Sequence, residues 1–101
     1  MSVIVINGSD STITITELWV NWPDEYVGLE YVKLEGKKIW NIGDEDPPTE
    51  MPPWTSPPKD REIKADSDEV LEFIFKEDDG ATALSSYGLI ITFDNGCTIS
   101  R

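Results

Sequence analysis

The sequence contains no histidine and only one cysteine, Cys97. Without histidine, general acid–base catalysis would fall to carboxylates or lysines, and the lone thiol has no imidazole to activate it as a nucleophile. One cysteine also cannot form a disulfide within the chain. We therefore expect that the protein is not an enzyme. Cys97 is predicted to be a small buried hydrophobic residue rather than one half of a bond between subunits.

Basic residues are scarce: the 101 residues include 8 Lys and Arg against 20 Asp and Glu, which gives a net charge of -12. Phosphate backbones and anionic membrane surfaces bind clustered Lys and Arg, so neither nucleic acid nor a membrane is an expected partner. No apolar stretch is long enough to span a membrane, and no secretion signal is visible at the N-terminus. The chain is thus expected to be intracellular or the mature form of a secreted protein.

Helical periodicity is absent as well, and the apolar residues recur with the period of two that is typical of strands. About seven or eight short strands are predicted, at 2–6, 12–20, 29–34, 38–42, 61–64 and 70–76 and in a hairpin at 87–100. This pattern predicts an all-β fold, an immunoglobulin-like antiparallel β-sandwich with a long proline-rich loop. Residues 1–11 would form an N-terminal strand and a flexible joint, and residues 12–101 the sandwich domain. An acidic turn at 77–80 and a connector at 81–86 are expected before the hairpin.

The predicted core requires one irregularity in the second strand. Ile13 and Ile15 share one parity whereas Leu18 and Val20 have the other, so a β-bulge at 16–17 is needed to bring both pairs to one face. With that bulge, the inward side chains are Ile13, Ile15, Val32, Leu34, Ile39, Leu71, Phe73, Phe75, Leu89, Ile91 and Phe93.

The C-terminal residues 87–100 contain the strongest turn signal, because Asn and Gly tolerate the backbone conformations of a tight hairpin. A two-residue Asn95-Gly96 loop would turn the apolar residues of the last strand to the wrong face. A three-residue loop at 94–96, with its glycine in the left-handed conformation, pairs Phe93 with Cys97 instead. Since register follows the buried face, we predict the three-residue loop.

Proline is concentrated in one segment, 43–59, which contains three Pro-Pro pairs. This composition favours extended polyproline conformation without a ladder of hydrogen bonds. We expect an ordered strap across the sandwich, anchored by Met51 and Trp54, with Trp19 packed beneath its proline rings. The alternative is a recognition loop or an O-glycosylated loop, with candidate sites at Thr49, Thr55 and Ser56.

Two kinds of ligand suit other side chains of the sequence. Carboxylates in turns are calcium ligands, and the candidate residues are Asp44, Glu45, Asp46, Asp66 and Asp68, unless these turns are simply solvated. Exposed tryptophans suit carbohydrate, so Trp19 and Trp54 are candidate stacking platforms. Asn7 begins an N-glycosylation pattern, which otherwise is a plain turn.

A set of apolar and turn residues between Thr12 and Ser100 resembles a known type of module. These residues are Trp22-Pro23, Leu29-x-x-Val32-x-Leu34-x-Gly36-x-x-Ile39-Trp40, the proline-rich segment, Arg61-x-Ile63, Leu71-x-Phe73-x-Phe75 and Phe93-Asp94-Asn95-Gly96-Cys97. The chain is similar to small all-β modules of uncharacterised bacterial secreted or cell-surface proteins, some of them pilus-like or repeated. The resemblance implies a structural role outside the cell or on its surface, and it carries over no catalytic or binding residue.

The N-terminal strand leads to the predicted function. Val3, Ile4, Val5 and Ile6 leave it no polar face, which would make it an aggregation hazard at a free sheet edge. Either it pairs within its own sheet, or it completes the sheet of the next copy as a donor strand, and head-to-tail exchange of this kind makes filaments. We therefore expect an extracellular structural subunit that self-assembles with copies of itself. The alternative is a carbohydrate- or calcium-binding module.

Overall fold

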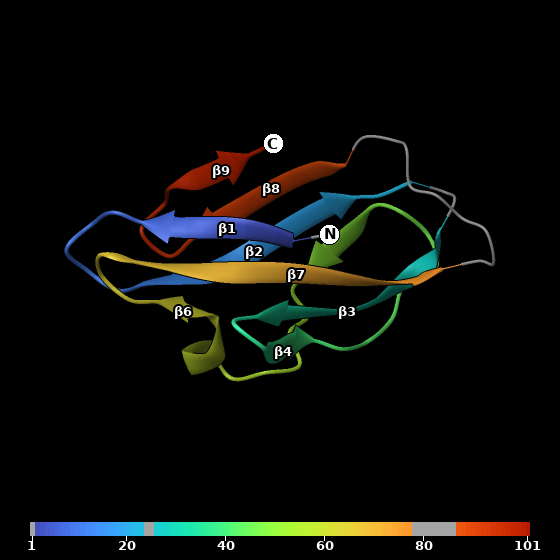
Figure 1. Ribbon diagram of the computed structural model, residues 1–101, viewed down its shortest axis with the longest axis horizontal. Helices are drawn as coiled ribbons and strands as arrows, with labels where there is room; N and C mark the ends of the chain where they lie inside the picture. Colours follow the sequence, from blue (N-terminus) through green and yellow to red (C-terminus); the bar gives the residue numbers. More distant parts are fainter. Residues whose placement is uncertain (1, 24–25, 78–86) are drawn as a thin grey trace.

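The computed structural model describes residues 2–23, 26–77 and 87–101 as two antiparallel β-sheets packed face to face (Figure 1). The all-β fold predicted from the sequence is confirmed. In these described residues the only helical element is one turn of 3-10 helix, η1, at Pro58–Arg61. The described part of the chain contains no helix that is long and apolar enough to cross a membrane.

The first sheet has the strand order β1-β7-β3-β4. These strands are β1 (Ser2–Asn7), β7 (Ser67–Glu77), β3 (Tyr26–Leu34) and β4 (Lys37–Trp40). The longest strand, β7, lies between the N-terminal strand and β3, so segments that are distant in sequence form the centre of this sheet.

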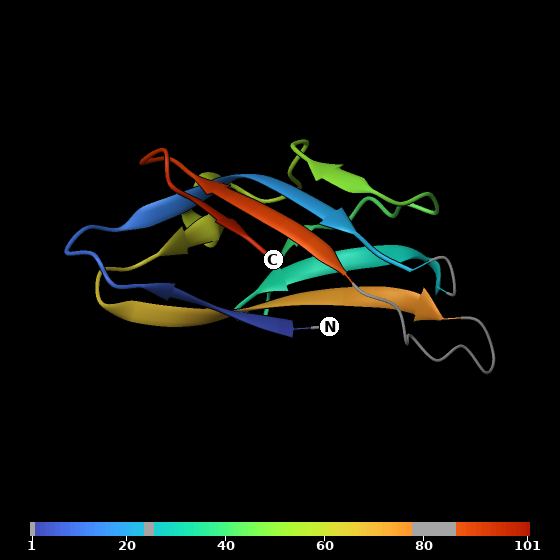
Figure 2. The ribbon, with the colours of Figure 1, turned by 90° about the horizontal axis from the view of Figure 1, so that it is seen from above.

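The second sheet has the order β5-β2-β8-β9, and the short β6 also pairs with β2. Its strands are β2 (Ile13–Asn21), β5 (Thr49–Met51), β6 (Glu62–Ile63), β8 (Gly88–Phe93) and β9 (Thr98–Ser100). Figure 2 shows the two layers from above, with β2 and β8 over β3 and β7.

The core between the sheets contains every residue predicted for it, and all except the partly buried Phe75 are fully buried. Alternation along the strands is therefore a sound guide to the inward face. The β2–β8 register shifts between Ile15 and Glu17, which confirms the bulge and explains why Leu18 and Val20 are buried beside Ile15.

The C-terminal hairpin has the predicted three-residue loop. The backbone N–H of Phe93 donates to the carbonyl of Cys97 at 2.9 Å, and Gly96 has a φ of 85°. The prediction that Cys97 is buried is wrong, because its side chain is exposed. Cys97 directly follows the hairpin loop and precedes the three-residue edge strand β9. Although alternation assigns its side chain to the inner face, at this position that face is not covered by the opposite sheet.

Several predicted element boundaries are corrected. Thr49–Met51 does form a ladder, with β2, so the proline-rich segment is not extended throughout without hydrogen bonds. The fourth strand ends at Trp40, and Ile42, which was expected within it, is exposed. Met51 is buried and Trp54 partly buried, as expected of anchors. The predicted turn at 77–80 and connector at 81–86 lie outside the described residues, apart from Glu77 at the end of β7.

Candidate functional site

One side of the sandwich is closed by side chains of the proline-rich segment and of the η1 turn at its end. Strand β2 pairs with β6 at residues 13–14 and with β5 at 18–20, which leaves the bulge between them without a strand partner on that edge. Arg61 Nη1 donates to the carbonyl of Ile15 at 2.6 Å, and Trp54 Nε1 donates to the carbonyl of Thr16 at 3.3 Å. Two side chains therefore replace the missing ladder bonds at the bulge.

Arg61 is only 8% exposed, and its guanidinium carbon lies 4.5 Å from the centroid of the Trp54 ring. Burial lowers the pKa of Arg61 from its ordinary value, yet an arginine stays charged at neutral pH. Its Nε has no hydrogen-bond partner among the described residues. The cation is stabilised by the Trp54 ring and the Ile15 carbonyl, and its role is to hold the strap on the bulge.

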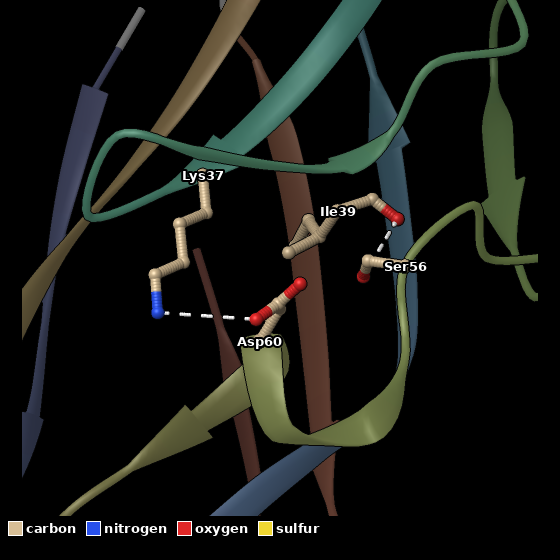
Figure 3. Close-up of polar contacts among 4 residues, drawn as sticks. All are labelled: Lys37, Ile39, Ser56 and Asp60. Atoms are coloured by element: carbon tan, nitrogen blue, oxygen red, sulfur yellow. Dashed lines mark hydrogen bonds and ion pairs between the residues drawn. The ribbon is translucent and has the colours of Figure 1, made fainter.

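The same segment covers the edge of β4 (Figure 3). The carbonyl of Ile39 accepts hydrogen bonds from Thr55 N at 3.1 Å and from Ser56 Oγ at 3.4 Å. Lys37 Nζ lies 3.8 Å from a carboxylate oxygen of Asp60, where η1 begins to turn back toward β6. At Ile39 the β4 edge is thus already bonded to residues 55–56 of the chain itself.

A buried hydroxyl fixes the start of the segment. Thr49 Oγ1 accepts from Trp22 Nε1 at 3.1 Å and donates to Asp44 Oδ2 at 2.7 Å. The other oxygen of Asp44 accepts from Asp46 N at 3.0 Å, and the Asp44 backbone exchanges two hydrogen bonds with Leu29. Asp44 thus fastens the loop to β3, and Thr49 is too deeply buried to carry a glycan in the folded chain.

The residues proposed as calcium ligands do not come together. Leu29, beside Asp44, pairs with Phe75 near the end of β7, whereas Asp68 pairs with Ile6 at its beginning. The two acidic groups, at 44–46 and 66–68, therefore lie at opposite ends of the longest strand. Within the described ranges no three acidic, cysteine or histidine side chains form a cluster that would hold a metal ion.

Asn7 ties the turn after β1 to the opposite edge of the molecule, although it was predicted only as a turn residue or glycan acceptor. Its side chain is 3% exposed. Its Nδ2 lies 2.8 Å from the carbonyl of Ser11, 2.9 Å from that of Ile63 and 3.1 Å from that of Lys64. Its Oδ1 accepts from the backbone N–H and the hydroxyl of Ser9. The joint at 8–11 is thus a fastened turn, and the amide is not accessible to a glycan in the folded chain.

The β1 edge is the exposed counterpart of the closed side. β1 pairs with β7 through an unbroken register of six residue pairs, and no other strand of the described residues pairs with it. Val5 is buried, but Ile4 and Ile6 on the outer face are 56% and 69% exposed. Natural edge strands are blunted by lysine, proline, bulges or a covering loop, and residues 2–7 have none of the first three.

The second open edge lies on the same side. β9 ends the second sheet as β1 ends the first, whereas β4, β5 and β6 lie on the side of the strap. In Figure 1, β9 and β1 occupy the upper part of the molecule, and β4 and β6 the lower part. β9 is short, and its pairing with β8 continues only to the reciprocal hydrogen bonds between Leu89 and Arg101. The longer β1 therefore offers the larger unpaired edge.

The two tryptophans proposed to stack on carbohydrate have different positions. Trp54 lies against Arg61 at the bulge. Trp19, predicted to pack beneath the strap, is partly buried on the outer face of the second sheet, where it pairs with Glu50 of the strap and with Ile90. It forms part of a shallow hollow of about 460 Å³. The hollow also involves Glu17, Glu50, Pro52, Ile90 and Thr92.

Among the proposed O-glycosylation sites, Thr55 is exposed and Ser56 is partly buried. The Ser56 hydroxyl already donates to Ile39.

Comparisons with protein families, with curated proteins and with solved structures found no match to this chain. The functional argument therefore depends on the two features that the fold leaves exposed, the β1 edge and the Trp19 hollow.

Proposed function

We propose that this chain is a structural β-sandwich module that associates with copies of itself through the β1 edge. The observation that carries this proposal is the unpaired edge of β1 with two exposed isoleucines on its outer face, Ile4 and Ile6. An added strand would satisfy the free backbone groups of the edge and bury both side chains, which is the chemistry of β-strand addition. The extracellular location stays a prediction from the sequence resemblance.

The strand order supports an immunoglobulin-like arrangement with one place empty. In that fold one sheet has the order A-B-E-D and the other contains C-F-G. β1, β7 and β3 have the pairing of B, E and D, and β2, β8 and β9 have that of C, F and G. Strand A of that fold would lie beside β1, at its open edge. In the proposed assembly, the strand of the partner copy takes this position.

The fastened turn after β1 favours addition of a strand over exchange of β1 itself. β1 pairs with β7 of its own chain, and the Asn7 side chain bonds to three backbone carbonyls beyond the strand. Exchange of β1 between copies would have to release these contacts, whereas edge addition keeps them. We infer antiparallel pairing of two β1 strands about a two-fold axis, with the predicted head-to-tail filament as the competing mode.

The net charge of -12 on every copy opposes this association. Asp68 and Glu69 on β7 pair with Ile6 and Val5 beside the edge, so approaching copies repel each other at low ionic strength. Salt screens exposed charges over about 8–10 Å near physiological ionic strength. The association is therefore expected to strengthen as salt is added, unlike a contact held by opposite charges.

A pair of isoleucine substitutions tests the proposal. Ile4→Lys places a charge on the open edge, whereas Ile42→Lys makes the same change at a side chain of matched exposure, 54% against 56%, after β4. Sedimentation equilibrium over a range of concentrations should show that the wild type and Ile42→Lys associate and that Ile4→Lys remains monomeric. A wild type that stays monomeric at every concentration and salt, or equal loss in both variants, contradicts the proposal.

A cross-strand disulfide separates the two modes of assembly. Ser2 pairs with Glu72, so cysteines at both positions, with Cys97→Ser to remove the exposed thiol, would lock β1 onto its own β7. Edge addition survives this lock, because the outer edge stays open. Strand exchange does not, and loss of assembly on oxidation with recovery on reduction would decide for the filament mode.

A further inference from the structure

The hollow beside Trp19 combines an aromatic ring with carboxylates and lacks a cation. Its lining includes Trp19, Ile90 and Pro52, together with Glu17 on the strand of Trp19 and Glu50 on the neighbouring strand. Glu17 and Glu50 are exposed, and among the described residues no lysine or arginine lines the hollow. The lining thus combines apolar side chains with two negative charges.

The Trp19 ring is held in place by a glycine on the neighbouring strand. A methyl group added at Gly88 would lie 3.0 Å from Cζ3 and 3.3 Å from Cη2 of the ring. Any larger residue at position 88 would therefore push the ring outward, toward the space that the hollow occupies. Trp19 pairs across the strands with Ile90, which also lines the hollow.

We propose that the Trp19 hollow binds an alkylammonium group. A cation within about 6 Å of a tryptophan face is attracted by the ring quadrupole. The carboxylates of Glu17 and Glu50 accept hydrogen bonds only and add Coulomb attraction for the same charge. The methyl or methylene groups of the ligand would contact Ile90 and Pro52. The source of the ammonium group is either a free quaternary amine or a lysine side chain, and both have the chemistry that this hollow recognises.

A neutral sugar is the competing ligand, and it fits the hollow less well. Sugar hydroxyls both donate and accept, so a sugar site usually supplies donors as well as acceptors to match them. The lining offers the Thr92 hydroxyl and two acceptor-only carboxylates at Glu17 and Glu50. A neutral sugar also has no net charge to be attracted by the two carboxylates, whereas an ammonium ligand does.

The test is an NMR titration at low ionic strength with choline and with its uncharged carbon isostere, 3,3-dimethylbutan-1-ol. The indole N–H signal of Trp19 and the backbone amide signals of Trp19 and Ile90 should shift when choline is added and should not shift with the isostere. Nα-acetyl-lysine amide distinguishes the lysine source from the free amine, since stronger shifts with it indicate a protein partner. Glucose and cellobiose are the sugar arm. Equal shifts with choline and its isostere, shifts with a sugar alone, or no shift with any ligand would overturn the proposal.

Variants connect the shifts to the hollow. Trp19→Ala should weaken choline binding about two- to fivefold, the range for an exposed cation–π contact. Glu17→Gln with Glu50→Gln should weaken it at least about twofold and reduce its salt dependence. Gly88→Ala tests the positioning of the ring without changing any ligand group, and it should also weaken binding. Glu30→Gln with Glu62→Gln removes two charges from exposed sites outside the hollow, and a loss equal to that of the first double variant would contradict the assignment.

Discussion

At the scale of single residues, two identical Asn-Gly dipeptides have different functions in this fold. Asn95 lies in the exposed hairpin loop and accepts one hydrogen bond, from Cys97 N. Asn7 is buried, and its amide nitrogen shares two N–H donors among the carbonyls of Ser11, Ile63 and Lys64. The sequence around both is a turn signal, and only the contact with residues 63–64, far along the chain, distinguishes them.

Asn7→Ala is therefore expected to lower the free energy of unfolding by about 2–4 kcal/mol, because it removes several hydrogen bonds of a buried side chain at once. Asn95→Ala, which removes one exposed bond, should cost less than about 1 kcal/mol. Urea unfolding of both variants measures the difference. Equal effects would mean that the Asn7 contacts do not fasten the turn.

Glu69, next to the β1 edge, has a pKa raised above its ordinary value of 4.5. Burial is the largest cause and the nearby Glu35 the next, with Lys37 and Lys64 acting in the opposite direction. The folded chain thus holds this proton more tightly than the unfolded chain. Its contribution to stability is present below pH 4.5 and is lost as the pH rises through the raised pKa.

The wild type should consequently gain stability from Glu69 as the pH falls from 7 toward 4.5, and Glu69→Gln should lack that part of the gain. Glu62→Gln, at an exposed site, is the matched control and should keep it. Chemical unfolding at several pH values compares the three slopes. Identical slopes for the wild type and Glu69→Gln would show that this carboxyl is not perturbed in the folded chain.

At the scale of elements, the proline-rich segment is a fastener that joins the edges of both sheets. It bonds to Ile39 on β4, pairs with β2 through Thr49–Met51, and covers the bulge with Trp54, beside Arg61 of η1. The trypsin sites after Lys59 and Arg61 lie in η1, within this fastened part. They are thus poor substrates while the chain is folded.

Trypsin should cut the native wild type at Lys59 only as fast as the chain unfolds. Trp54→Ala removes the ring over Arg61 and the bond to Thr16, so cleavage at Lys59 should become faster. Trp54→Phe keeps the ring and loses only the bond, and an intermediate rate is expected. Rapid cleavage of the native wild type at Lys59 would contradict an ordered strap.

The elements also show how far the sequence alone predicts this fold. The bulge in β2, the hairpin register and the core follow from parity, which is local information. The β5 ladder, the buried Arg61 and the fastened Asn7 depend on which distant segments meet, and no pattern within one strand encodes that. The burial of Cys97 was wrongly predicted for the same reason. Alternation along a strand indicates which face a side chain is on, but not whether the opposite sheet extends far enough to cover it.

At the scale of the whole molecule, the strap closes one side of the sandwich and leaves the other open. β1 and β9 both end their sheets on the open side, and β1 carries exposed Ile4 and Ile6. The candidate sites predicted from the sequence are only partly brought together: the β1 residues and Trp19 lie in exposed features, whereas the acidic groups remain apart. Self-association through β1 is the proposal that these features support best.

Backbone hydrogen exchange as a function of protein concentration tests that proposal most directly. The alternate amides of β1 that do not bond to β7 are unpaired in a single copy, so they should become protected as concentration rises, while the strap amide of Thr55, already bonded to Ile39, should not change. Exchange of β1 at the same rate at every concentration would contradict edge-to-edge association, and so would new protection confined to other strands.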